Sequence, residues 1–417
     1  MSTIYWKGTA DAVAQVSTIQ ITADDAATTY KVTIGGVEVS CSGAGTGVND
    51  TASALQAALD ASTHPYFTAI TWTVATDTVT GTAGTAGVPF VATSSVSGGT
   101  GTIGAVTAST ASSGPNDWST ADNWSGGAVP VNSDDVIIQD NDVNICWGLD
   151  QNSVALTSLT IKKTYTGKIG LRYTEFATSA DGDTRDSSKP EYRDTYLKIV
   201  STSVDLGEHF GPGAPAGSTR IKLDLHTTAS TVIVHGTANT SAETGLPAVR
   251  LKATHANTDV YVRSAPGGVG VAVDVPGETS TVRKISVSDT TTKSRVSCGA
   301  GTTLTTWEQL GGSNVLEAAG TVTTVETNGG TLQIEGSYTI TALNVNGGTV
   351  NDNHGGSPAV TTATLKGGVT DTQGSNQDRT YTTVNLWPGA TLQGDSDNLT
   401  ITTLNESGGK YTLSASA

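Results

Sequence analysis

Acidic residues in close pairs are the side chains of this 417-residue chain best suited to hydrolytic chemistry. Asp134 and Asp135 are adjacent, and Asp181 lies two residues before Asp183. Glycoside hydrolysis uses two carboxyl groups roughly 5 to 9 Å apart, and calcium requires about six or more oxygen ligands. Both pairs also fit a structural role, because Asp134 and Asp135 precede a predicted strand, whereas Asp181, Asp183 and Asp186 lie in a polar loop. We therefore assign none of them to catalysis or metal binding.

The histidines and cysteines form no recognisable chemical motif. The six histidines are dispersed, without the paired spacing of a zinc site, although His226 and His235 could approach each other across neighbouring coils. Cys41, Cys146 and Cys298 are odd in number and far apart, unlike a disulfide framework. No nucleophile elbow and no phosphate-binding glycine loop occurs. The sequence therefore predicts no catalytic residue, no metal site and no cofactor.

A repeat is the strongest pattern in the chain, and it must position every side chain in its region. One phrase occurs six times, beginning at Thr303, Thr321, Thr339, Ala359, Thr380 and Thr400. Each copy contains two short segments of alternating Val, Ile, Leu and Thr, which is typical of β-strands. A period of roughly 20 residues indicates a solenoid. The spaced Leu and Asn of a leucine-rich repeat are missing, so the fold class we predict is mainly β, a parallel β-helix.

Glycines separate the two segments of each copy. In the second copy these are Gly329 and Gly330. Because glycine has no Cβ, it can adopt the positive φ that a sharp corner requires. We predict that the equivalent glycines stack in a column of corners, with coils about 4.8 Å apart; these glycines are Gly347, Gly348, Gly367, Gly368, Gly389 and Gly408.

The chain before the repeats is organised differently. Residues 1–100 predict a small β-rich or α+β domain with one helix, capped by Asp50 and burying Leu55, Ala58 and Leu59. Residues 101–115 are rich in Ser, Thr and Gly and predict a linker. The strands predicted in the domain are Gln15–Ile21, Tyr30–Val39, Phe67–Val74 and Val88–Thr93.

The β-helix is predicted to begin with a tryptophan-rich segment at residues 116–135. Trp118 and Trp124 would cover the apolar end of the first coil as a cap. Residues 136–300 predict irregular coils interrupted by loops, of which Tyr173–Asp194 and Gly207–Gly217 are the longest. Residues 301–417 predict regular coils, each roughly 18–21 residues long.

Two further tryptophans lie within the regular repeats. Trp307 occupies a position that is apolar in the other copies, so it is predicted to pack inside or at a subunit contact. Trp387 precedes the corner formed by Pro388 and Gly389, where a side chain points outward and could contact a sugar or a protein partner.

Charge and hydropathy exclude several classes of partner and location. The formal net charge of −16 and the pI of 4.6 argue against nucleic acid or an anionic membrane. The first residues lack the basic and apolar regions of a signal peptide, and no stretch approaches the roughly 18 apolar residues of a membrane span. The sequence therefore predicts neither secretion through a signal peptide nor membrane insertion.

The segment Trp118–Pro130, WSTADNWSGGAVP, followed by Thr- and Gly-rich coils, resembles the first part of β-helical surface proteins of the bacterial autotransporter and adhesin kind. The whole chain, including its opening STIYWKG, resembles structural proteins of tailed bacteriophages. An autotransporter would require a secretion signal and a C-terminal membrane barrel, which are not found, so the virion resemblance is favoured. It implies assembly in the host cytoplasm, a place on the virion surface and other virion proteins, of capsid or tail, as partners.

The function predicted from these patterns is that of a non-enzymatic structural component of a tailed-phage virion, a capsid-decorating or head-fibre protein. The alternatives are a tail fibre or spike, an adhesin that binds host-surface glycans, and a polysaccharide depolymerase. The last repeat runs to Ser414 without a capping unit, and an open solenoid end favours pairing with other chains. A homo-oligomer, with a trimer favoured, is therefore expected.

Overall fold

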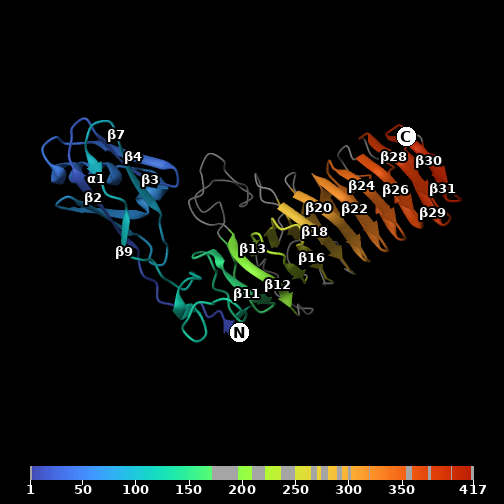
Figure 1. Ribbon diagram of the computed structural model, residues 1–417, viewed down its shortest axis with the longest axis horizontal. Coiled ribbons are helices and arrows are strands. Elements are labelled where there is room, and N and C mark those ends of the chain that lie inside the picture. Colours follow the sequence, from blue (N-terminus) through green and yellow to red (C-terminus); the bar gives the residue numbers. More distant parts are fainter. Residues whose placement is uncertain are drawn as a thin grey trace.

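The chain forms a long parallel β-solenoid with a smaller domain at one end (Figure 1). The computed structural model describes residues 2–170, 196–208, 221–235, 249–263, 270–273, 280–288, 294–298, 302–318, 320–353, 359–373, 377–395 and 397–414. The fold is mainly β, with 56% strand and 6% helix, and the solenoid extends from residue 135 to residue 413. The parallel β-helix predicted from the repeats is therefore confirmed.

Two columns of parallel strands build the solenoid, and in each column a strand pairs with its equivalent in the next coil. The first column consists of β1 (Thr3–Tyr5), β10 (Asp135–Ile138), β11 (Asp150–Lys162), β12 (Leu197–Glu208), β14 (Thr231–Val234), β16 (Asp259–Val262), β18 (Ser280–Val287), β20 (Thr302–Gln309), β22 (Thr321–Thr327), β24 (Thr339–Val345), β26 (Ala359–Leu365), β28 (Arg379–Leu386) and β30 (Leu399–Glu406).

The second column begins where β13 pairs with the start of β12. Its strands are β13 (Ile221–Asp224), β15 (Val249–Lys252), β17 (Gly270–Ala272), β19 (Ser294–Cys298), β21 (Ser313–Ala318), β23 (Thr331–Glu335), β25 (Thr349–Asn351), β27 (Gly368–Asp371), β29 (Ala390–Asp395) and β31 (Lys410–Ser414).

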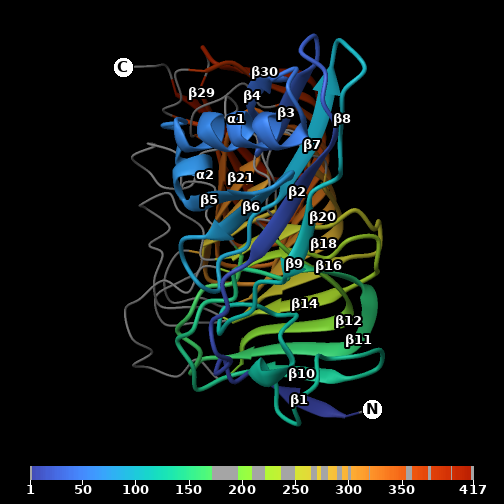
Figure 2. The same cartoon turned by 90° about the vertical axis from the view of Figure 1, so that its left-hand side faces the viewer.

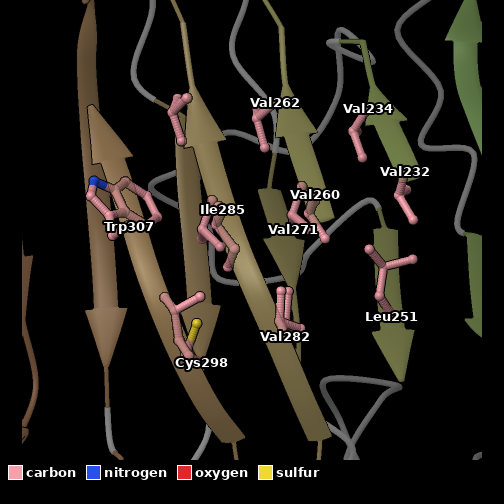
Figure 3. Packing of buried hydrophobic residues seen from close by; sticks show 14 of the residues in the cluster. Val232, Val234, Leu251, Val260, Val262, Val271, Val282, Ile285, Cys298 and Trp307 are labelled. Carbon is pink, nitrogen blue, oxygen red and sulfur yellow. The ribbon is translucent and has the colours of Figure 1, made fainter. Parts of the chain in front are cut away.

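Inward-facing aliphatic side chains fill the solenoid interior. In β22, Val322 and Val325 are both buried although they lie three residues apart, so strict alternation is interrupted between them, while Thr321 and Thr323 are exposed. Stacked equivalents form one apolar cluster that extends from the first coil to Leu392. Figure 3 shows this packing for the middle coils, where valines, Ile285 and the ring of Trp307 lie above one another between the strands. Because burying such a side chain contributes roughly 1.5–3 kcal/mol, each coil is stabilised by the coils on either side.

The smaller domain has two antiparallel sheets and a helix. One sheet contains β5 (Ile70–Ala75), β6 (Thr78–Ala83), β2 (Val16–Ala23), β8 (Thr102–Ile103) and β9 (Thr107–Thr110); the other contains β4 (Val37–Ser42), β3 (Thr29–Ile34) and β7 (Ala92–Ser97). Helix α1 (Val48–Asp60) packs on them through Leu55 and Leu59, in a core separate from that of the solenoid. The short helices are α2 (Pro65–Thr68) and the 3-10 helix η1 (Ala121–Asn123).

The first residues belong to the solenoid, not to the small domain as predicted for residues 1–100. Strand β1 pairs in parallel with β10, at the end of the stack (Figure 2). The chain then enters the small domain and returns beside its own starting point, where Val13 bridges Ser113 and Trp6 bridges Trp124. The domain is thus an insertion into the first coil. The sequence could not reveal this, because Thr3–Tyr5 is too short a strand to indicate its partner.

Residues 101–115 are not the predicted linker. Strands β8 and β9 lie within them and pair with β2. Threonine and serine are compatible with an exposed edge strand, so a Ser/Thr/Gly composition alone did not distinguish strand from linker. These two strands add to the sheet of the inserted domain.

Local details of the domain differ from prediction in several places, and the predicted strand Val88–Thr93 begins only at Ala92. Gly47, not Asp50, is the N-cap of α1, and Asp50 lies in the first turn. The segment Tyr30–Val39 is a hairpin, since Gly35 and Gly36 both have positive φ and turn β3 into β4. The predicted strand Phe67–Val74 begins inside α2 instead.

Candidate functional site

Three tryptophans pack together at the β1 end of the solenoid. The ring of Trp124 lies 4.6 Å from that of Trp118 and 5.0 Å from that of Trp6, both in edge-on contact. All three are buried within the solenoid core cluster, and Trp124 Nε1 donates a hydrogen bond to the Trp118 carbonyl, 2.7 Å away. The structure therefore brings together the two tryptophans singled out in the sequence and adds Trp6 from the N-terminal strand.

Asn123 connects the ends of the insertion beside these rings. Its fully buried side chain accepts a hydrogen bond from the Ala10 amide and donates to the carbonyls of Gly114 and Asp117. Sequence reasoning missed Asn123, because an asparagine in a turn-rich segment is ordinary. The three bonds hold both chain crossings between the solenoid and the inserted domain.

The second glycine of each corner pair stacks on its equivalent in the preceding coil. Gly330, Gly348 and Gly368 have φ of 75°, 83° and 76°. A Cβ on Gly348 would lie 2.4 Å from the Gly330 carbonyl oxygen, and one on Gly368 would lie 2.1 Å from that of Gly348. Gly312 precedes them in the same column. Glycine is thus required here both by backbone conformation and by the close approach of the next coil.

The other glycines named from the sequence are less crowded. Gly329, Gly347 and Gly367 precede the column just described and have no positive φ. Gly389 and Gly408 have φ of 91° and 118°, but a Cβ on Gly389 would meet its nearest atom only at 3.9 Å. The corner at Gly389 is therefore looser than those before it, whereas at the last corner a Cβ on Gly409 would lie 2.6 Å from the Trp387 carbonyl oxygen.

The two tryptophans of the regular coils have opposite environments. Trp307 is fully buried in the core (Figure 3), and its Nε1 has no hydrogen-bond partner among the described residues. Trp387 is 48% exposed at its corner. Nearby on the same outer surface, the Asn405 amide donates to Asn385 Oδ1 at 2.8 Å. An exposed indole beside amide groups could contact a sugar ring or a protein partner.

Charged side chains gather on the outer face of the middle coils, a feature the sequence did not indicate. Arg283 binds Asp259 through two nitrogens. Lys284 Nζ lies 2.8 Å from a Glu308 carboxylate oxygen, which also accepts a hydrogen bond from Ser286 Oγ at 2.7 Å. The pairing was hidden because the partners lie in successive coils, so that each is far from the other in the sequence.

The pairing shifts the proton affinities of these groups. The hydrogen bond to Glu308 raises the pKa of Lys284. Burial acts to raise the pKa of Glu308, but the hydrogen bonds from Lys284 and Ser286 outweigh it, so that its pKa lies below the ordinary value. The hydrogen bond with Asp259 likewise raises the pKa of Arg283. All of these shifts favour the charged forms.

One cluster of ionisable side chains lies inside the solenoid. Asp352 accepts hydrogen bonds from the hydroxyls of Tyr338 and Tyr381, at 2.6 and 2.8 Å, and lies 3.4 Å from Arg379 Nε. Asp352 and Arg379 are each 1% exposed. Burial raises the pKa of Asp352, while the two tyrosines and the arginine act in the opposite direction. This network replaces aliphatic packing between neighbouring regular coils.

The acidic pairs considered for catalysis are placed as follows. Asp134 is buried and accepts hydrogen bonds from the amides of Ser2 and Val131, both at 3.0 Å, while Asp135 accepts one from Ser158. Both therefore serve the first coils structurally. The second candidate group consists of Asp181, Asp183 and Asp186 and lies outside the described residues. The same holds for the predicted loop Tyr173–Asp194 and for most of the predicted loop Gly207–Gly217.

His226 and His235, the two histidines considered together from the sequence, have different partners. His235 lies 3.3 Å from Asp205, whereas the backbone amide of His226 is bound by Asp224. Among the residues that the structure describes, no group of three or more His, Cys, Asp or Glu side chains could hold a metal ion. No described helix is long and apolar enough to cross a membrane.

Comparisons with known proteins leave the fold as the main guide to function. No family model matches the chain, and no curated protein or solved structure matches it significantly.

Proposed function

We propose that this chain is a non-enzymatic structural component of a tailed-phage virion, a capsid-decorating or head-fibre protein that projects from the particle surface. The observation that carries the proposal is the continuous ladder of parallel strands. Thirteen strands follow one another in the first column from β1 to β30, which at about 4.8 Å per strand gives a stack roughly 60 Å long. A stack of this length keeps the two ends of the solenoid at a fixed distance from each other.

The inserted domain supports a role in attachment. It lies at one end of the solenoid, as Figure 1 shows, and its core is separate from the solenoid core. The tryptophan cluster and the bonds of Asn123 fix it to the first coil. A domain held at the end of a rod is well placed to bind a capsid or tail protein while the remaining coils extend outward. The phage assignment itself comes from the resemblance of the sequence.

Labelled electron microscopy of phage particles tests this proposal. Antibodies raised against the purified chain should place gold on the head surface of particles from lysates of the host that carries the gene. Gold confined to the tail would instead support the tail-fibre alternative. Absence of the chain from purified particles, measured by mass spectrometry, would contradict both.

A glycan-binding role is the second candidate, favoured by exposed Trp387. Stacking on an aromatic ring is a common way to hold a sugar. On a glycan array, we expect retention by the wild-type chain and its loss in Trp387→Ala. Leu310→Ala is a matched control, because Leu310 is 44% exposed at the corresponding corner of an earlier coil. Equal retention by all three proteins would exclude Trp387 as the contact.

The trimer expected from the sequence stays a proposal. Light scattering on the purified full chain measures it directly, and a mass near three times 42.3 kDa is expected. A monomer at micromolar concentration would contradict self-association.

A further inference from the structure

Threonines form a regular array on one outer face of the last six coils, here called the threonine face. Every position in it is exposed. Its first column is Thr303, Thr321, Thr339, Ala359, Thr380 and Thr400, and its second column is Thr305, Thr323, Thr341, Thr361, Thr382 and Thr402. Eleven of these twelve positions are threonine.

The array is in register in both directions. The residues of the first column are direct strand partners from coil to coil. The second column lies two residues further along, and the residues on either side of each member are paired in the same way. The side chains therefore repeat about every 4.8 Å along the solenoid and roughly 6.6 Å along each strand.

Strand propensity alone does not account for this composition. Threonine is favoured in strands generally, so the second strand column of the same coils is an internal control. Its two corresponding ladders are Ser313, Thr331, Thr349, Val369, Thr391, Lys410 and Val315, Gln333, Asn351, Asp371, Gln393, Thr412. Only four of these twelve positions are threonine, and charged residues occur among them. The second strand column therefore lacks this uniformity. A third ladder of the first column shares the composition but is only partly exposed in five of its six positions; it consists of Thr306, Thr324, Ala342, Thr362, Thr383 and Thr403.

The face has few of the features that bind proteins or sugars. It covers roughly 240 Å², estimated as five coil spacings of about 4.8 Å by a width of about 10 Å, whereas a standard protein interface buries about 800 Å² per partner. It carries no Trp, Tyr or Arg, the residue types that dominate binding hot spots. It also carries no charge, although the whole chain has a net charge of −16.

What the face does offer is a lattice of hydroxyl and methyl groups. None of the eleven threonine hydroxyls has a hydrogen-bond partner within the described part of the chain. Each can therefore bind water, and ordering a single water costs up to about 2 kcal/mol. This entropic cost is smaller when the bound water molecules already belong to an ordered solid, and many equal contacts to such a solid add together.

We propose that the threonine face binds the surface of ice. Its two repeats resemble the spacings between oxygen atoms on a prism plane of hexagonal ice, and the stacked coils keep the side chains in a fixed array. Hydroxyls would join the hydrogen-bonded lattice, while the methyl groups would fit between its water molecules. This inference is independent of the virion role.

Partition into growing ice tests the proposal with the full-length chain. A dilute solution is frozen slowly onto a cooled surface, and the protein in the ice fraction is compared with that in the liquid. Serum albumin is the non-binding reference. We expect the wild-type chain to be enriched about tenfold over albumin, since many weak contacts act together.

Substitutions within one coil distinguish the face from the rest of the surface. Thr341→Tyr places a bulky ring in the centre of the threonine face and should remove most of the enrichment. Thr349→Tyr makes the same change in the second strand column of the same coil and should leave enrichment unchanged. Circular dichroism checks the fold of each variant, and Thr382→Tyr replaces Thr341→Tyr if the latter unfolds.

Two results would overturn the proposal. One is a wild-type chain that partitions into ice no better than albumin. The other is equal enrichment of the folded variants Thr341→Tyr, or Thr382→Tyr in its place, and Thr349→Tyr, which would mean that retention in ice does not involve this face.

Discussion

The middle coils and the last six coils share one backbone ladder but differ in regularity. In the middle region, Thr231 pairs with Asp259 of the next coil, whereas Thr321 pairs with Thr339, so the middle coil is the longer of the two. The middle coils carry ion pairs at their outer surface, in which Arg283 is exposed but Asp259 is buried, and Lys284 and Glu308 are partly exposed. The described part of the last coils contains a buried pair instead, Asp352–Arg379.

Coil length explains this difference. A coil close to the minimum length places each residue directly on its equivalent, so columns of glycine and threonine can form. A longer coil keeps the strand pairing but leaves its loops free to vary, and outward positions then acquire individual partners. Parallel strand pairing therefore determines the backbone structure of both regions. Only the short coils also place the same residue type at the same position in successive coils.

The largest expected effect is at the buried network of the last coils. Asp352→Ala should destabilise the chain by about 3–5 kcal/mol, because Arg379 would remain as a buried charge without its carboxylate. The tyrosine hydroxyls of the network would also lose their acceptor. Chemical denaturation monitored by circular dichroism measures this change.

The double variant Asp352→Leu with Arg379→Met is the control for that experiment. Replacing both members of a buried pair by apolar residues is often close to neutral, so the part of the loss caused by the unpaired Arg379 charge should return, while the hydroxyls of Tyr338 and Tyr381 still lack their acceptor. A cost below about 1 kcal/mol for Asp352→Ala alone would mean that the network does not stabilise the stack.

Glycine corners give the next largest effect. Gly348→Ala should cost about 2–3 kcal/mol, because a Cβ meets the Gly330 carbonyl oxygen and the positive φ becomes strained. Gly389→Ala keeps the strain without the crowding and should cost about 1 kcal/mol. Equal losses in thermal melts of the two variants would show that close approach between coils is unimportant.

The partly exposed ion pairs of the middle coils should matter much less. The side chain of Arg283 is 54% exposed, so Arg283→Ala should lower the unfolding free energy by clearly less than Asp352→Ala does. The difference should shrink as salt is raised from low concentration to 1 M, since the Debye length falls to about 3 Å. A loss as large as that of Asp352→Ala would remove the contrast between the two regions.

The smallest effect is the pH dependence associated with Glu308. Its folded-state pKa is lowered, so the carboxylate contributes stability above its ordinary pKa of 4.5, and this contribution is lost as the pH falls below that value through the folded pKa. Glu308→Gln should therefore flatten the acid side of the stability profile slightly. Melting temperatures between pH 3 and pH 7 measure the difference, and an unchanged slope would contradict the shift.

Sequence reasoning succeeded where a pattern repeats locally. Leu332 and Ile334 could be assigned to one face because alternate residues of a strand face opposite sides, and the corner role of Gly330 followed from its place between two strands. Trp118 and Trp124 could be identified together because both lie in one short segment.

Contacts between distant parts of the chain were not predictable in this way. Trp6 and Asn123 act at the crossing between the solenoid and its inserted domain, although they lie far apart in the sequence. Asp352 meets Arg379 only because one coil stacks on the next. A single sequence contains no signal for such pairs.

The parallel β-helix could be predicted from the residues alone, because a repeat of about 20 residues with alternating apolar side chains can bury them only by stacking. The place of glycine at the corners could also be predicted, since backbone conformation is a local property. The tertiary structure alone decided that the first strand joins the solenoid, that the small domain is an insertion, and that exposed threonines align as an array. These features depend on which residues meet across coils, and that register is set by strand pairing over the whole stack.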